Sequence, residues 1–139
     1  MTTPTRGVRN NNPGNIRKNG TPWDGLAPIQ ADTEFFTFIN PEHGVRAIVK
    51  ILMTYQDTYH LHTVRGMISR WAPPNENNTS AYVNFVAAAV GVGPDTAVNI
   101  RQRDTARKLV AAIVAQENAR YSYPDEVIEA GLTLAGVLV

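Results

Sequence analysis

From residue 40 onward, the chain carries apolar residues at helical spacing, separated by short polar breaks. Across residues 41–58 these residues recur every three or four positions, which predicts an amphipathic helix. Asn40 is suited to cap this helix, Pro41 to occupy its first position, and Glu42 to interact with its positive N-terminal end. The expected apolar face consists of Val45, Ile48, Val49, Leu52 and Tyr55.

Four shorter helices are predicted downstream by the same reasoning. Prolines follow the first and a Gly-Val-Gly-Pro segment follows the second, and both signals favour a helix end. These helices are expected to start at residue 62 or 63, at Thr79, at about residue 104, and at Ser122 to Pro124. The first of them is expected to end near Trp71 and the third near Asn118.

Residues 1–39 have a different character, because asparagine, proline and glycine favour turns there. The stretch EFFTFI (34–39) is aromatic and β-branched, which predicts a short strand. We therefore expect a single domain over residues 1–139 with an α+β fold that is mostly helical. Residues 1–39 would form a small polar β lobe, and residues 40–139 a helical lobe.

The composition fits one globular domain. With 139 residues, 43% of them hydrophobic, the chain has enough apolar material for one core but not for two ordinary domains. The net charge of +1 gives no global reason to expect a nucleic-acid partner. The basic cluster at residues 101–108 is expected to be a solvated face, with DNA binding as the alternative.

Several other classes of site and location are not predicted. The chain has no cysteine, so it has neither disulfides nor thiolate chemistry. The polar N-terminus predicts no signal peptide, and the apolar tail is shorter than the ~20 residues that span a bilayer. No phosphate loop, dinucleotide fingerprint or catalytic serine motif is present, so no cofactor is predicted. His60 and His62 fit exposed histidines better than a metal site.

Glu117 is the main candidate for chemistry. It lies near the end of the apolar stretch AAIVAQEN, four residues after Ile113 and seven after Val110, which places it on the buried side of the predicted helix. Partial burial penalises the charged form of a carboxylate, as a general acid requires. The alternative is a structural glutamate bonded to neighbouring backbone or to an arginine.

Three other glutamates are weaker candidates. Glu42 is also explained by the dipole of the helix that it begins. Glu76 lies in the loop before Thr79 and would bind either Arg70 or a ligand. Glu34 is either a surface residue or a second carboxylate in a cleft.

Two motifs carry a resemblance to a known family. The segments NNNPGNIR (10–17) and WAPPNENNTSAY (71–82), followed by AAIVAQEN, resemble phage and prophage virion proteins related to lysozyme-like peptidoglycan hydrolases. Proteins of this kind are described either as lytic transglycosylases or as phage structural proteins. The resemblance covers nearly the whole chain.

A second resemblance bears on the fold. The order NPGNI, WDG, FTFINPEHG is similar to flagellar-type glucosaminidases, in which a glutamate-bearing helix precedes these motifs. Here the segment AAIVAQEN, which resembles the glutamate helix of goose-type lysozymes and soluble transglycosylases, comes last. A circularly permuted lysozyme-like fold would account for this order.

The resemblance implies cleavage of the β-1,4 glycan backbone of peptidoglycan by a single glutamate, as a lytic transglycosylase or a muramidase. It implies Glu117 as acid, with Glu76 and Glu42 as further catalytic candidates. Side-chain amides and aromatic rings would then bind the sugar. The implied substrate-binding residues are Asn11, Asn12, Asn15, Trp23, Trp71 and Tyr82.

The same resemblance leaves a non-catalytic role open. In that interpretation the chain is a virion structural or peptidoglycan-binding protein. The implied partners are bacterial peptidoglycan and other virion proteins. The implied location is the phage particle, or the host cytoplasm before release, with action in the cell wall or periplasm.

Overall fold

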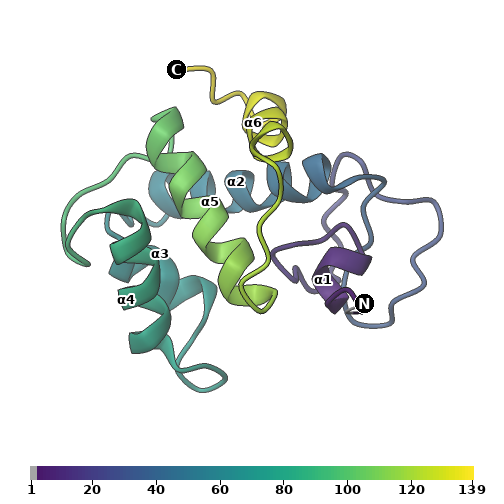
Figure 1. Ribbon diagram of the computed structural model, residues 1–139, viewed down its shortest axis with the longest axis horizontal. Helices are drawn as coiled ribbons and strands as arrows, with labels where there is room; N and C mark the ends of the chain where they lie inside the picture. The colour runs from purple at the N-terminus through teal and green to yellow at the C-terminus, as the bar shows by residue number, and fades with distance from the viewer. Residues whose placement is uncertain (1–2) are drawn as a thin grey trace.

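A computed structural model describes residues 3–139. These residues form six helices (Figure 1), namely α1 Arg6–Arg9, α2 Pro41–Asp57, α3 Val64–Trp71, α4 Thr79–Val90, α5 Arg103–Glu117 and α6 Asp125–Leu134. The helices α2 to α6 match the five predicted ones to within a few residues at each end. The short helix α1 lies in the segment that was expected to form only turns and strands.

Side-chain caps set the starts of several helices. The Asn40 side chain accepts a hydrogen bond from the His43 backbone N–H at 2.9 Å, as predicted for α2. Thr63 does the same for α3, accepting from Gly66 at 3.0 Å. The cap of α4 is Asn78, not the predicted Thr79.

The core forms around α2. This helix contacts α3, α5 and α6, and the rest of the helical part is assembled on it (Figure 1). Its buried face is the one predicted from the apolar spacing, although Tyr55 at the end of that face is only half-buried. Residues with no exposed surface from α2 and α5 are Val45, Ile48, Val49, Leu52, Ala106, Leu109, Val110 and Ile113.

The prediction of an N-terminal β lobe is wrong. Residues 3–139 contain no sheet, and strand-like pairing is limited to three isolated bridges, Arg17–Phe35, Leu26–Phe38 and Thr63–Ala97. The molecule is therefore all-helical, not α+β. The lysozyme-like, circularly permuted fold that was expected to contain this lobe is not supported either.

Side-chain amides explain why no sheet forms. The alternation in residues 34–39 does place Phe36 and Phe38 in the core. However, side-chain amides take up part of the backbone hydrogen bonding of this segment, and its backbone pairings go to separate residues, such as Asn10, Ile16 and Gly25, instead of to one partner strand. Asn12 donates to the carbonyls of Ile16 and Phe36 at 3.0 and 2.9 Å, and Gln30 accepts from the Thr37 N–H at 2.8 Å. Proline and glycine interrupt the neighbouring segments, so no continuous ladder is available.

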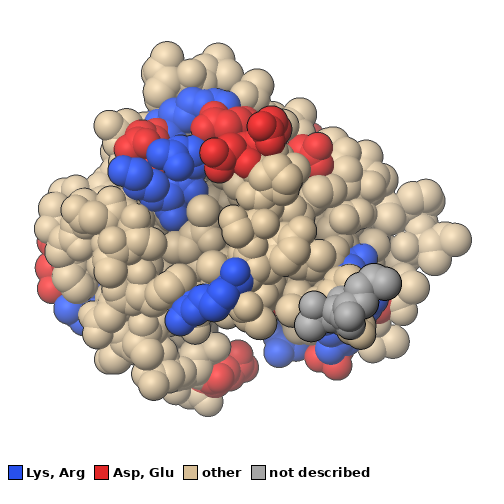
Figure 2. Space-filling model, in the orientation of Figure 1, with Lys and Arg blue, Asp and Glu red and all other residues tan. Residues whose placement is uncertain are grey.

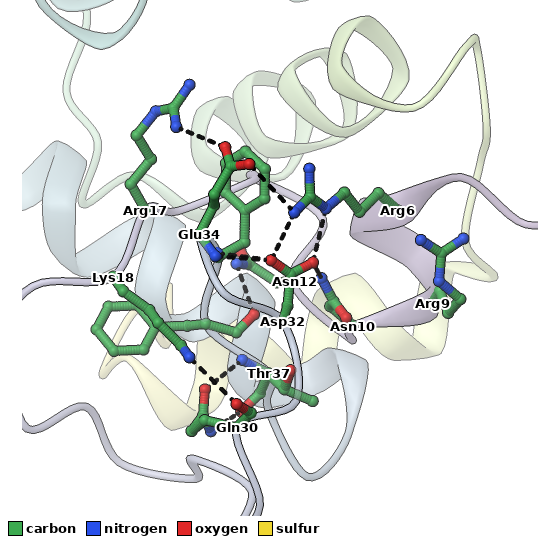
Figure 3. Close-up of polar contacts among 12 residues, drawn as sticks. Arg6, Arg9, Asn10, Asn12, Arg17, Lys18, Gln30, Asp32, Glu34 and Thr37 are labelled. Carbon is green, nitrogen blue, oxygen red and sulfur yellow. Dashed lines mark hydrogen bonds and ion pairs between the residues drawn. The ribbon is translucent and has the colours of Figure 1, made fainter.

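An ion-pair network fixes α1 to the segment 30–37 (Figure 3). The guanidinium of Arg6 donates to both carboxylate oxygens of Asp32, at 2.6 and 2.7 Å, and the Asn10 amide donates to Asp32 at 3.0 Å. The Asp32 side chain is only 8% exposed. The hydrogen bonds from Arg6, and then those from Asn10 and the Glu34 backbone, hold the pKa of Asp32 well below its ordinary value of 3.8.

This network predicts a loss of stability in acid. A lowered folded-state pKa means that the stabilisation is complete above the ordinary pKa and declines as the pH falls below it. We expect the variant Asp32→Asn to have a lower melting temperature than the wild type at pH 7, and the two proteins to converge as the pH drops below about 4. Circular dichroism melts across pH 2–8 measure this.

The matched control is Asp24→Asn. Asp24 pairs with Arg46 at 3.1 Å, but its side chain is 72% exposed, so its removal should change the melting temperature little. A constant difference between wild type and Asp32→Asn across the whole pH range would contradict the assignment.

The basic cluster at residues 101–108 is paired with acids. Arg101 binds Asp57 at 2.7 Å, Arg103 binds Glu129 at 2.5 Å, and Lys108 binds Asp104 at 3.0 Å. Figure 2 shows blue and red side chains intermixed over α5 and α6. The predicted solvated face is therefore a set of exposed ion pairs. Within residues 3–139, no helix is long and apolar enough to cross a membrane.

Candidate functional site

Glu117 lies at the C-terminal end of α5, which points toward the N-terminal segment (Figure 1). The side chain is half-buried, because the preceding turns of α5 pack Val110 and Ile113 into the core. Its carboxylate accepts two hydrogen bonds. The Asn15 amide donates to one oxygen at 3.1 Å, and the Tyr82 hydroxyl donates to the other at 2.9 Å.

No cation binds this carboxylate within the described part of the chain. The structural alternative was a glutamate bonded to neighbouring backbone or to an arginine. The two hydrogen bonds to this carboxylate come instead from the side chains of Asn15 and Tyr82. Both donors to Glu117 are neutral groups. They orient the side chain.

Tyr82 on α4 is buried, with 3% of its surface exposed. Burial and the negative charge of Glu117 raise the pKa of its hydroxyl far above the ordinary value of 10. The hydroxyl therefore remains protonated at any physiological pH and remains a donor to Glu117.

Asn15 and Asn118 join the N-terminal segment to the end of α5. Asn15 adopts a left-handed backbone conformation, with φ of 49°, and its amide also contacts the Glu117 carbonyl at 3.3 Å. The buried Asn118 amide donates to the Pro13 carbonyl at 2.7 Å and accepts from the Thr5 hydroxyl at 2.6 Å. These bonds hold Asn15 beside the carboxylate, even though the two segments lie at opposite ends of the sequence.

A polar cleft of about 180 Å³ opens beside Glu117. Its remaining lining residues are Gly14, Asn15, Arg17, Phe35, Trp71, Ala72, Glu76 and Asn77. Glycine is required at position 14, because a Cβ there would lie 2.8 Å from Ile48 and 3.1 Å from the Trp71 ring. The missing side chain lets the indole pack against the N-terminal segment and form one wall of the cleft.

The structure brings five of the predicted site residues together. Glu117, Asn15, Trp71 and Glu76 line the cleft, and Tyr82 supports Glu117 from the helical side. Glu117 therefore has an open polar space beside it and predicted sugar-binding groups around it.

Four other predicted site residues lie elsewhere. Asn12 is fully buried, and Asn11 donates to the Phe38 carbonyl at 3.1 Å, so both amides bind backbone and neither lines the cleft. Trp23 does not line the cleft itself and lies in another hollow of the surface. Glu42 lies in the first turn of α2, near Tyr123. Burial, and then the nearby Tyr121 and Glu42, raise the pKa of Tyr123 to about 12.

Sequence reasoning missed four residues of the site, namely Arg17, Phe35, Asn77 and Asn118. The signal for Asn118 was present, since it directly follows the candidate acid at a helix end. Asn77 lies within a segment already singled out as a motif. Arg17 likewise ends the NNNPGNIR segment. For Phe35 no local pattern indicates a cleft, because it meets the cleft only through the folding of the N-terminal segment.

A metal site is not part of this arrangement. Across residues 3–139, no three histidine, aspartate or glutamate side chains gather closely enough to hold a metal ion. His60 and His62 are exposed.

Comparison with known proteins places the chain among phage proteins. It is 38% identical over 129 residues to Protein P5 of Pseudoalteromonas phage PM2, a match that covers 91% of this chain and 79% of the relative. The chain belongs to the family of Protein P5. The phage origin expected from the NNNPGNIR and WAPPNENNTSAY segments is thus supported. No protein-family model matches the sequence.

Proposed function

We propose that this member of the P5 family cleaves the β-1,4 glycan backbone of peptidoglycan, with Glu117 as the single acid and base. The observation that carries the proposal is the half-buried Glu117 carboxylate, which has two neutral hydrogen-bond donors and faces a polar cleft. A carboxyl group that is not neutralised by a cation is free to exchange its proton with a ligand.

The groups around the cleft are suited to a sugar. The amide of Asn77 offers a donor and an acceptor to hydroxyl and N-acetyl groups, without charge, whereas the Asn15 amide is directed to Glu117. The ring of Trp71 offers apolar surface, on which a pyranose ring stacks. The Phe35 ring is instead covered by the guanidinium groups of Arg6 and Arg17, at 4.6 and 5.0 Å from its centre.

The reaction follows from these groups. Protonated Glu117 donates its proton to the glycosidic oxygen as the bond from C1 to that oxygen breaks. The oxygen of the 6-hydroxyl of the same sugar then attacks C1, and the Glu117 carboxylate accepts the proton of that hydroxyl. The product is a 1,6-anhydro sugar. This transglycosylase route needs one carboxylate, whereas most glycoside hydrolases use two. Glu76 in the same cleft is the candidate second carboxylate for hydrolysis by a muramidase.

The test is digestion of purified sacculi, followed by mass spectrometry of the soluble products. An anhydro-muramic end supports transglycosylation, and a reducing muramic end supports a muramidase. Sacculus binding is measured in parallel by sedimentation. Binding without any soluble product would refute the catalytic proposal.

The second candidate function is a virion structural or wall-binding protein without turnover. Membership of a phage protein family supports this candidate, because phage proteins include the components of the particle. In this case the cleft would hold the glycan, and Glu117 would act only as a hydrogen-bond acceptor.

Tyr82→Phe is expected to reduce kcat about 10-fold with little change in KM, since a hydrogen bond to a charged group contributes about 1.5–3 kcal/mol. The hydroxyl holds the carboxylate in place and does not itself reach the cleft lining. Turnover of soluble glycan fragments measures the effect.

The control is Tyr121→Phe, which removes an exposed hydroxyl away from the cleft. Unchanged kcat in a folded Tyr82→Phe variant would show that the tyrosine does not orient Glu117.

A further inference from the structure

The cleft at Glu117 continues into a longer groove. A second hollow of about 320 Å³ shares Gly14, Asn15, Arg17, Trp71 and Glu76 with the cleft. A third, of about 480 Å³, shares Ile16, Ile51, Tyr55 and Arg70 with the second and reaches Trp23 and Tyr59. We call these two hollows together the side groove.

The charge of the lining changes along this path. The cleft contains two carboxylates, Glu117 and Glu76, and one cation, Arg17, which pairs with Glu34. Glu76 and Arg17 also border the second hollow. No acidic residue lines the third hollow, where the only charged side chain is that of Arg70. A ligand that runs from the cleft into the side groove therefore passes from acidic to basic surroundings.

Arg70 is held in place without an acidic partner. Its guanidinium stacks on the Tyr59 ring at 3.6 Å and lies 5.5 Å from the centre of the Tyr55 ring. Within residues 3–139 it makes no ion pair, unlike Arg17, which binds Glu34 at 3.3 Å. A guanidinium fixed by stacking keeps its hydrogen-bond donors available, and its planar fork matches a carboxylate.

We propose that Arg70 binds a carboxylate of the stem peptide on a glycan strand seated in the cleft. This inference rests on the proposed function, which places the strand at Glu117. Peptidoglycan differs from other β-1,4 glycans because its muramic acid residues carry peptides with free carboxylates. A cation in a groove beside the cleft therefore selects peptide-substituted strands over bare strands.

Binding is measured in a Glu117→Gln background, so that the ligand stays intact. The probes are fluorescently labelled glycan strands of equal length, either with their stem peptides or after removal of these peptides by an amidase. Because amide hydrolysis leaves a lactyl carboxylate on each muramic acid, these carboxylates are then capped as methylamides. We expect about five-fold tighter binding of the substituted strand, which is the scale of an exposed ion pair, and a smaller preference at high salt.

Arg70→Gln should abolish this preference, and Arg70→Lys should retain part of it, because lysine keeps the charge but not the planar fork. The matched control is Arg65→Gln, on the same helix, which removes the same charge from an arginine that pairs with Asp95 outside the groove. Circular dichroism verifies the fold of each variant.

Three results would overturn the proposal. The first is that the Glu117→Gln protein binds both strands with equal affinity. The second is that the preference for the substituted strand persists when Arg70→Gln is added. The third is that Arg70→Gln weakens the binding of both strands equally. Cleavage by the wild type is scored separately on both strands. If cleavage is absent but the Arg70-dependent preference is present, then the catalytic proposal fails and the carboxylate site stands.

Discussion

Glu117→Gln is expected to abolish glycan cleavage, with a loss of about 10²- to 10⁴-fold in kcat, the usual contribution of a general acid. Glutamine cannot donate a proton to the glycosidic oxygen, but it has nearly the same shape as glutamate. Its carbonyl oxygen can still accept a hydrogen bond from Asn15 or Tyr82, so the fold and the affinity for sacculi should be retained. Release of soluble muropeptides measures turnover, and a sedimentation assay measures binding.

The matched control is Glu126→Gln. Glu126 is exposed in the first turn of α6 and makes no ion pair within the described residues, so the charge change is the same but lies away from the cleft. Undiminished turnover in a folded Glu117→Gln variant would refute the role of Glu117. Glu76→Gln would then be the next variant to measure, because Glu76 is the other carboxylate of the cleft.

Asn12→Ala is expected to destabilise the protein by about 3 kcal/mol, since each buried polar group that loses its partner costs about 1–3 kcal/mol. The fully buried Asn12 amide accepts from the Ile16 N–H at 2.9 Å and donates to the carbonyls of Ile16 and Phe36. Alanine leaves all three backbone groups without this partner. Urea unfolding, followed by circular dichroism, measures the change in free energy.

The control for this prediction is Asn75→Ala, in the exposed loop between α3 and α4, where the side chain makes no hydrogen bond to a described residue. Its free energy of unfolding should stay within about 0.5 kcal/mol of the wild type. A similarly small change for Asn12→Ala would show that water replaces its hydrogen bonds. The N-terminal segment would then be held mainly by Arg6 and Asp32.

The asparagines of NNNPGNIR therefore divide into two roles. Asn10, Asn11 and Asn12 bind other parts of the N-terminal segment and build it, whereas Asn15 binds the carboxylate at the cleft. Their identical chemistry explains why the sequence suggested one role for all. An amide that binds backbone and an amide that holds a carboxylate at a cleft have the same side chain, and only the folded structure separates them.

The helices could be predicted because their signals are local. Apolar spacing, capping residues and the prolines that stop a helix lie within a few positions of one another, so the sequence defines α2 to α6 without tertiary information. The position of Glu117 on the buried side of α5 follows from the same periodicity. The mistaken strand at residues 34–39 shows the limit of this reasoning, because a strand also needs a partner elsewhere in the chain.

The sequence by itself determined five helices, their apolar faces and the half-buried Glu117. Only the tertiary structure decided that Asn15 and Tyr82, which lie 102 and 35 residues away along the chain, would both donate to that carboxylate. It also decided that the N-terminal segment would be built on side-chain amides instead of a sheet. The physical reason is that helix periodicity is set by neighbouring residues, whereas a site is set by how distant segments pack.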